Sequence, residues 1–503
     1  MSTLRPEDAE RLDANRLRIP GEVPAVVFAN ERVHVGREAI EELRGLLELR
    51  HTVERAHAAA PELFSVAPEV ERLALSPDFH KGAGIPIGTS LLTRGFCVPQ
   101  AVGNDINCGV RLHVCKGVEA DRVRARLDAL EPALRRLFFE GGRAIPLGPE
   151  QRRGLLRDGL PGLLDAPRPP AKGTIWEGWD DAAERRDLAR VRHGGRFPTS
   201  SLIPPLEEYA ARDGLVRDSQ IGSVGGGNHF VELQRVKRVV SGAAAHAWGL
   251  EPGTLVVMVH SGSVGIGHAC GGWYVDAAKK AWPKGLPWPA NGIFPLPDRS
   301  PAWGPFFSAL HTAAHFAFAN RLFLARMARQ ALEAVLGSAF DFPLVYDTPH
   351  NLAWVQDDGR VLHRKGASPA GGHGAGPDEW FGEPVLVPGS MGSSSWVLEG
   401  RGLDEALGSA SHGAGRQEHR GAASHHTDAE LDRFLAEFRV VTALDPARQD
   451  VKRRPEILEA WRRTLKEEAP WAYKPVTPVI ETLEGAGIAV PVAELTPLLT
   501  VKG

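Results

Sequence analysis

Apolar residues recur every three to four positions along three segments of the chain, a spacing that places them on one face of an α-helix. Residues 37–60 carry this pattern and predict one or two helices. Residues 118–138 carry it again, and Pro132 predicts a break or bend there, because proline removes a backbone donor. The longest helical pattern covers residues 303–338, which are rich in Ala, Phe and Leu.

Two shorter segments, residues 255–260 and 343–347, are apolar without helical spacing and predict buried strands. Residues 140–200 mix Gly, Pro and Arg, and residues 283–305 are rich in Pro and Gly, so we expect peripheral insertions or loops there. No repeat or linker divides the chain, and its distinctive motifs run from residue 78 to the end. We therefore predict a mixed α/β fold in a single large domain over residues 1–503.

Composition narrows the class of protein. A hydrophobic share of 43% and a charged share of 24% are those of a soluble globular chain. The net charge of −3 provides no global basic field, so a nucleic-acid partner would need locally concentrated positive charge. The first twenty residues lack a secretory signal's apolar core, and no apolar run approaches the ~18–20 residues of a membrane span. We expect no membrane partner.

Cysteine usage points to a reducing compartment. The four cysteines form no CxxC pair and are too few for a disulfide framework in a chain of 503 residues. We therefore predict a cytoplasmic protein whose cysteines are buried or bind metal. They are Cys97, Cys108, Cys115 and Cys270.

Six glycine-containing stretches each hold a histidine, aspartate or cysteine beside small polar residues. Glycine lets the backbone approach a ligand closely, and runs of glycine expose N–H groups that can cradle phosphate. Their repeated occurrence favours phosphate binding over ordinary turns. The stretches are 76–88, 102–113, 222–233, 259–268, 347–354 and 409–420; a seventh, 386–395, has glycine and serine without a metal-ligand residue.

The same stretches supply candidate metal ligands. Asp105 and Cys108 are three residues apart and can face one point, and His229, His260 and His350 can complete the set. A lone histidine is more often a hydrogen-bonded bystander, and Cys108 alone could be a small buried hydrophobe. We assign such structural roles to other histidines. His113 is expected on a strand, His311 and His315 packed on the long helix, and His425 and His426 facing solvent.

His412 lies in SASHGAGRQEHR among Gly413, Ala414 and Gly415, whose small side chains leave the imidazole uncovered. Arg416 adds a fixed positive charge. Such a loop suits presentation of an imidazole to a phosphate. For Arg416 two roles stay open, bidentate phosphate binding or an ion pair that orders the loop.

These motifs resemble the RtcB family of tRNA-splicing ligases from about residue 20 to the end of the chain. The resemblance implies an RtcB-like fold, with central sheets flanked by helices around a deep metal and nucleotide cleft. It implies an RNA ligase that joins 3′-phosphate or 2′,3′-cyclic phosphate ends to 5′-hydroxyl ends, in tRNA splicing or RNA repair. Its cofactors would be GTP and two Mn²⁺ ions, although a thiolate with imidazoles also suits zinc.

The resemblance also implies roles for individual residues. His412 would form a covalent bond to GMP, and Cys108 and His260 would be shared between two metal ions, with Asp105, His229 and His350 as the other ligands. The nucleotide contacts carried over in the same way are Asn228, Glu232, Asn351, Pro388, Gly389, Ser390, Met391, Gly413, Ala414, Gly415, Arg416, Tyr473 and Lys502.

Three positions depart from the family pattern. Val264 stands where arginine is usual, His419 stands where serine is usual, and Lys81 occupies an unusual place in the first stretch. Two alternatives therefore stay open: a paralogue with a specialised substrate, such as damaged ribosomal or transfer RNA, or an enzyme that caps 3′ ends with GMP without efficient sealing. The same residues could also serve a metal-dependent phosphoesterase or a non-catalytic nucleotide-binding regulator. The family likeness further suggests a monomer, with an archease-type activator as a possible partner.

Overall fold

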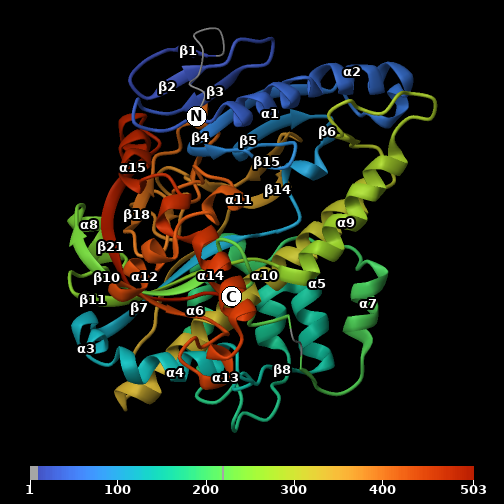
Figure 1. Ribbon diagram of the computed structural model, residues 1–503. Helices are drawn as coiled ribbons and strands as arrows, with labels where there is room; N and C mark the ends of the chain where they lie inside the picture. Colours follow the sequence, from blue (N-terminus) through green and yellow to red (C-terminus); the bar gives the residue numbers. More distant parts are fainter. Residues whose placement is uncertain (1–8, 218–219) are drawn as a thin grey trace.

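Two large β-sheets form the framework of the molecule, and helices cover them (Figure 1). The structure is a computed structural model that describes residues 9–217 and 220–503. The first sheet is antiparallel except for the parallel pair β3–β4. Its strands, in spatial order, are β1 (Glu10–Arg11), β2 (Arg16–Arg18), β3 (Ala25–Phe28), β4 (Glu69–His80), β5 (Ile87–Arg94), β15 (Val361–Lys365) and β14 (Asn351–Val355).

The second sheet contains the strands whose ends adjoin several of the glycine-containing stretches. Its strands, in spatial order, are β13 (Leu344–Pro349), β7 (Gly109–Glu119), β11 (Thr254–Ser261), β10 (Phe230–Val239), β21 (Ala489–Val501), β18 (Ser395–Gly400) and β17 (Pro384–Val387). A further strand, β20 (Arg439–Val441), pairs in parallel with β21. The predicted strands at 255–260 and 343–347 are confirmed as β11 and β13.

The long helix α10 (Trp303–Leu336) packs against β11 and β7 and against three other helices. Most of its side chains are buried around the full circumference, which is the pattern of a helix enclosed by other elements. The prediction for 303–338 is confirmed. Its helical neighbours are α4 (Leu127–Phe138), α5 (Pro149–Asp165) and α9 (Val264–Ala281).

Residues 37–60 form two helices, α1 (Arg37–Leu47) and α2 (Leu49–Ala59), as predicted. Residues 118–138 also form two helices, but the predicted break at Pro132 is wrong. The helical path is interrupted at Arg126, between α3 (Ala120–Arg124) and α4, and Pro132 lies inside α4. Burial of Leu130 and Leu134 on one face of α4 offsets the one backbone hydrogen bond that proline removes.

The two regions expected to be peripheral differ in structure. Residues 140–200 contain α5 and α6 (Asp181–Asp187), and α5 packs directly on α10. Residues 283–305 form an extended loop with one short strand, β12 (Leu296–Pro297), before α10 begins. The remaining helices are α7 (Pro204–Ala211), α8 (Gly242–Ala247), α11 (Arg420–Ala423), α12 (Asp428–Glu437), α13 (Gln449–Lys452), α14 (Pro455–Glu468) and α15 (Val476–Gly485).

Further short strands pair outside the two main sheets. They are β6 (Phe96–Cys97), which pairs with β12, β8 (Pro146–Leu147) with β9 (Val216–Arg217), and β16 (Ala367–Pro369) with β19 (Ser409–Ser411). All four cysteines are buried and free. None of the described helices combines the length and apolar character that a membrane crossing requires.

The antiparallel register of the second sheet brings distant motifs to one edge. Gly109 at the start of β7 pairs with Ser261 at the end of β11 and with Pro349 at the end of β13. Phe230 at the start of β10 pairs with His260. Because adjacent strands alternate in direction, starts and ends of successive strands meet at the same edge. Cys108, His229, His260 and His350 each lie within or directly beside these terminal positions.

Candidate active site

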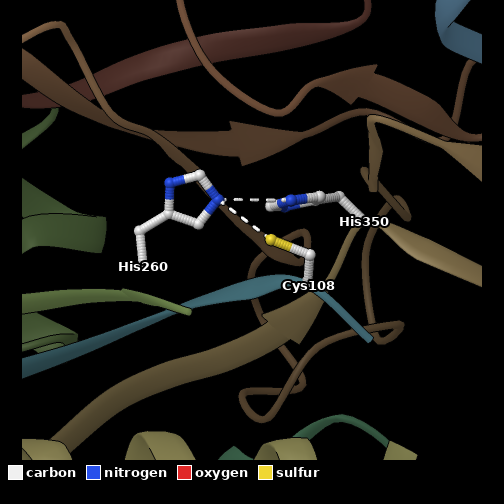
Figure 2. Close-up of side chains that lie close together, drawn as sticks. All are labelled: Cys108, His260 and His350. Atoms are coloured by element: carbon white, nitrogen blue, oxygen red, sulfur yellow. Dashed lines mark hydrogen bonds between the residues drawn. The ribbon is translucent and has the colours of Figure 1, made fainter. Parts of the chain in front are cut away.

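The predicted metal ligands converge in two overlapping groups that share Cys108. One group is Cys108, His260 and His350, and the other is Asp105, Cys108 and His229; within each, the candidate ligand atoms lie within 4.8 Å of one another. Figure 2 shows the first group, in which Nε2 of His260 lies 3.3 Å from Sγ of Cys108 and 3.3 Å from Nε2 of His350. The sharing of His260 between two ions stays a prediction, since it belongs to one group only.

The second group is equally close. Nε2 of His229 lies 2.8 Å from a carboxylate oxygen of Asp105 and 3.1 Å from Sγ of Cys108. Glycine is required at two neighbouring positions. A Cβ at Gly262 would lie 2.1 Å from an Asp105 oxygen, and a Cβ at Gly225 would lie 2.6 Å from Nδ1 of His229.

Buried Arg321 of α10 holds the segments that carry these ligands. Its Nη1 donates to the carbonyl oxygen of Asn107 at 2.6 Å and to that of Ser261 at 3.0 Å. Its Nε donates to Asp347 at 2.8 Å. Asn107 precedes Cys108, Ser261 follows His260, and Asp347 lies three residues before His350. One guanidinium therefore ties three ligand-bearing segments to the central helix, a role that sequence reasoning missed.

The environment of the cluster favours a cation. Burial raises the pKa of the Cys108 thiol well above its ordinary value, and the Asp105 carboxylate adds to this effect. Burial likewise lowers the pKa of His260 and of His350 far below that of a free imidazole, so both rings are neutral. A thiol in such a place ionises only when a cation is bound beside it. The donor set of carboxylate, thiol and imidazoles fits divalent transition metals.

The cluster opens onto a cavity of about 1060 Å³. Nearly all of the site residues predicted from the sequence line it. They are Asp105, Cys108, Asn228, His260, His350, Asn351, Pro388, Gly389, Ser390, Met391, His412, Gly413, Ala414, Gly415, Arg416, Tyr473 and Lys502. His229 and Glu232 do not line it, although His229 completes the second ligand group.

His412 lies against both the ligand cluster and a buried carboxylate. Its ring centroid is 4.7 Å from that of His350, and its Nδ1 is 2.5 Å from Oδ2 of Asp78. The backbone N–H of His412 donates to the same oxygen at 3.2 Å. Burial acts to raise the pKa of Asp78, but the His412 ring and the Ser76 hydroxyl outweigh it and leave that pKa below its ordinary value.

Asp78 and its neighbours belong to the first glycine-containing stretch. From the sequence alone, no site role was assigned to Asp78 or His80. His80 also lines the cavity, and burial lowers its pKa to about 3. Lys474, another lining residue, donates from Nζ to the carbonyl oxygen of Phe79 at 2.7 Å, and burial lowers its pKa to about 8. The presence of an aspartate and a histidine in one glycine-containing stretch was the signal that could have identified Asp78 and His80 as site residues.

Arg416 is already engaged within the protein. Its guanidinium forms an ion pair with buried Glu468, donates to the Tyr473 hydroxyl at 3.2 Å and lies 4.8 Å from the centroid of that ring. Tyr473 in turn donates to Glu468. This arrangement matches the loop-ordering ion pair and leaves no direct support for Arg416 as the phosphate holder. Glu468 was missed because nothing in the sequence links α14 to residue 416.

Several other predicted nucleotide contacts also have partners of their own. Lys502 donates from Nζ to the carbonyl oxygens of Gly227 and His229, and burial lowers its pKa to about 8. Asn351 donates to the carbonyl oxygen of Asp105 at 3.0 Å and accepts from the N–H of Gly366 at 2.7 Å. The Asn351 amide therefore braces a ligand-bearing loop as well as lining the cavity.

Glu232 lies in the sheet with 3% of its surface exposed. Its carboxylate accepts hydrogen bonds from Thr500 and from Gln234. Burial raises its pKa to about 7. A direct contact of Glu232 with a nucleotide therefore stays a prediction.

The first glycine stretch does not offer all of its N–H groups to a ligand. The N–H groups of Gly82 and Gly84 donate to the carboxylate of Glu42 on α1, at 2.6 and 3.2 Å. The phosphate cradle expected there is thus filled by a protein carboxylate. Lys81, one of the unusual residues, pairs with Glu38 at 3.0 Å on the surface.

The other two departures from the family pattern have local structural roles. Val264 begins α9 with φ of 42°, a left-handed conformation that is rare for a β-branched residue. His419 is the N-cap of α11, where its Nδ1 accepts from the N–H of Ala422 at 3.3 Å. A serine would cap this helix in the same way.

Most of the histidines assigned structural roles are confirmed. His113 lies on β7, and His311 and His315 are buried on α10. His425 is exposed as predicted. The prediction for His426 is wrong, because its half-buried ring stacks on Trp471 with centroids 4.9 Å apart.

Comparison with known proteins places this site in a family. The family model described as tRNA-splicing ligase RtcB matches residues 63–503. A tRNA-splicing ligase RtcB of Thermococcus kodakarensis is 34% identical, over 97% of this chain and 95% of its own length. The RNA-splicing ligase RtcB of Mycobacterium bovis is 35% identical over 85% and 96%, and the tRNA-splicing ligase RtcB of Archaeoglobus fulgidus is 31% identical over 85% and 86%. The chain, with its shared cysteine and converging histidines, belongs to the RtcB family of tRNA-splicing ligases.

Proposed function

We propose that this protein is a GTP-dependent RNA ligase that joins 3′-phosphate or 2′,3′-cyclic phosphate ends to 5′-hydroxyl ends. The observation that carries the proposal is the position of His412. Its ring lines the cavity, lies 4.7 Å from that of His350 in the ligand cluster and has Nδ1 beside Asp78. A nucleophile beside a cation site is what transfer of a highly charged phosphate requires.

Asp78 orients the nucleophile. With Nδ1 held at 2.5 Å from the carboxylate, Nε2 is the ring atom that attacks the α-phosphorus of GTP. The N–P bond forms as the bond to pyrophosphate breaks, which gives guanylylated His412. Two Mn²⁺ ions held by Asp105, Cys108, His229, His260 and His350 would supply neutralisation of the phosphate charge.

The RNA is then activated and sealed. An oxygen of the RNA 3′-phosphate attacks the phosphorus on His412, the N–P bond breaks, and GMP caps the RNA end. A cyclic phosphate must first be opened by water. The 5′-hydroxyl then attacks the capped 3′-phosphate, and GMP leaves. The loop from Gly413 to Gly415 and the segment from Pro388 to Met391 enclose the nucleotide in this proposal.

The experiment is incubation with GTP labelled at the α-phosphate in the presence of Mn²⁺. We expect an acid-labile adduct of GMP with the protein, which disappears in His412→Ala while Mn²⁺ binding persists. Release of phosphate without an adduct would identify a phosphoesterase, and neither product would identify a nucleotide-binding regulator. An adduct that caps RNA without joining it would identify a capping enzyme. Addition of an archease-type activator and determination of the mass in solution test the proposed partner and monomer.

A further inference from the structure

The cavity extends beyond the part assigned to the nucleotide. Its lining also includes residues from the start of α1, from the turn between β4 and β5 and from the 3₁₀ turn Pro99–Ala101, and we call this part of the lining the arm. Arg37, Lys81, Gln100 and Val275 are among its lining residues. Because the predicted nucleotide contacts are other residues of the lining, we take this arm as the path of a strand whose end reacts at His412.

The loop after α9 is hydrogen-bonded to a residue of this arm and to α1. Nε2 of Gln100 donates to the carbonyl oxygen of Gly292 at 3.0 Å, and the amide of Asn291 donates to the carbonyl oxygen of Gly45 on α1 at 2.8 Å. Figure 1 shows this loop projecting from the end of α9 beside α2. The loop is therefore fixed to two elements that form the arm.

Among the large apolar side chains of this loop, Trp288 is the most exposed, with 68% of its surface accessible. Its edge-to-face contact with Phe294 has centroids 5.2 Å apart, and Phe294 contacts Trp282 in the same way at 5.7 Å. Pro287 and Pro289 restrict the backbone on both sides. An indole supported by buried rings and a stiff backbone is a rigid aromatic platform.

The charge around the platform suits an anionic chain. Lys280 and Lys284 are exposed, and neither has an ion pair within residues 9–217 and 220–503. Exposed aromatic rings with flanking cations are how proteins bind single-stranded nucleic acid, because every base offers a face for stacking. The hydrogen bond between this loop and the lining residue Gln100 favours an RNA strand over a protein partner, because only the strand must reach the cavity.

We propose that Trp288 stacks on a base of the RNA strand whose 3′ end lies in the cavity, an inference that rests on the proposed function. Gly292 lies four positions after Trp288, so their Cα atoms are at most about 14 Å apart. At roughly 3.4 Å per nucleotide, this span corresponds to about four nucleotides from the arm. Trp288 therefore binds long strands and not the terminal nucleotides alone.

Trp380 provides a matched control. It is 80% exposed, and the nearby Asp378 accepts hydrogen bonds from Arg190 and Trp248, neither of which lines the cavity, whereas the Trp288 loop is bonded to the lining residue Gln100. Truncation of either indole leaves the buried core in place. A difference between the two variants therefore reports position relative to the cavity and not the general loss of surface tryptophan.

The test measures binding of fluorescently labelled RNA strands with a 3′-phosphate, of two and of ten nucleotides, by anisotropy at one fixed salt concentration. We expect Trp288→Ala to weaken binding of the ten-nucleotide strand about tenfold and to leave the dinucleotide unchanged. Trp288→Phe should retain most of the affinity, and Trp380→Ala should bind both strands as the unaltered protein does.

Equal affinity of Trp288→Ala and Trp380→Ala for the long strand would overturn the proposal, and so would an equal loss on both strand lengths. Formation of the GMP adduct without RNA separates this outcome from failure of the proposed function. If the unaltered protein forms no adduct, the proposed ligase chemistry fails. If adduct forms normally in Trp288→Ala and long-strand affinity is unchanged, only the stacking platform fails.

Discussion

The two walls of the cavity differ in whether their polar groups are left to bind a ligand or are paired within the protein. On the wall formed by the edge of the second sheet, Cys108, His260 and His350 bring their ligand atoms together. On the wall formed by residues 412–420 and 468–474, Arg416 is neutralised by Glu468. The first wall is suited to bind a positive charge, whereas the second, which we call the balanced wall, already pairs its Arg416 guanidinium with a protein carboxylate.

The largest expected effect removes the ligand common to both groups. Cys108→Ala should abolish tight Mn²⁺ binding at both positions, whereas His229→Ala should leave the Cys108, His260 and His350 group able to hold one ion. Titration calorimetry with MnCl₂ gives the stoichiometry. Alanine fills most of the thiol's volume, so both variants should fold. Two ions bound by Cys108→Ala would contradict the shared ligand.

The next effect concerns the support behind the same wall. Arg321→Lys should lower Mn²⁺ affinity by about 10- to 100-fold, because lysine cannot reach the acceptors beside all three ligand segments. Arg326→Lys is the matched control, since Arg326 is buried on the same helix but donates to Ile175 and Glu177. Calorimetry measures affinity and chemical denaturation measures stability. Equal Mn²⁺ affinity in the two variants would leave Arg321 a purely structural residue.

The third effect concerns the interior of the second sheet, behind the walls, and changes the free energy of unfolding and not metal binding. The pKa of Glu232 is raised to about 7, so the folded protein binds its proton more tightly than the unfolded chain does. The stability from this group is complete below about pH 4.5 and is lost as pH rises through about 7. Glu232→Gln should therefore match the unaltered protein near pH 4 and be more stable at pH 8, by at most roughly 3 kcal/mol.

Urea denaturation at both pH values provides the measurement. Asp450→Asn is a suitable control, because Asp450 is an exposed carboxylate outside the cavity and the sheet interior. A difference between Glu232→Gln and the unaltered protein that does not change with pH would show that folding does not shift the pKa of Glu232.

The smallest effect tests the balanced wall. Glu468→Gln removes the carboxylate that neutralises Arg416 and also approaches Arg420 at 3.4 Å. The freed positive charge should tighten GTP binding about fivefold, which corresponds to roughly 1 kcal/mol, and should lower the free energy of unfolding by a similar amount. Calorimetry with a non-hydrolysable GTP analogue measures the affinity, and urea denaturation measures the free energy of unfolding. Weaker GTP binding would show that the Glu468 pair positions Tyr473 for the nucleotide.

Local motifs predict much of the site. Glycine beside a histidine or cysteine is a signal within a short stretch, and it located Cys108, His260 and His350, which the structure brings together. Residues without such a local signal were missed. Arg321 lies in an apolar helical pattern, and Glu468 lies at the end of an amphipathic helix, where a charge is usually exposed.

The sequence by itself predicted the helices at 37–60 and 303–338, the strands at 255–260 and 343–347, and the side chains that can bind a cation, because periodicity and residue chemistry are properties of short stretches. It also predicted that the His412 imidazole is uncovered, and this prediction is wrong, because packing against distant segments leaves His412 buried with 7% of its surface exposed. Only the tertiary structure decided that Asp78 faces His412, that Glu42 fills a glycine cradle and that Arg416 is neutralised by Glu468. Each of these pairings joins residues dozens to hundreds of positions apart, and strand register and helix packing set their distance.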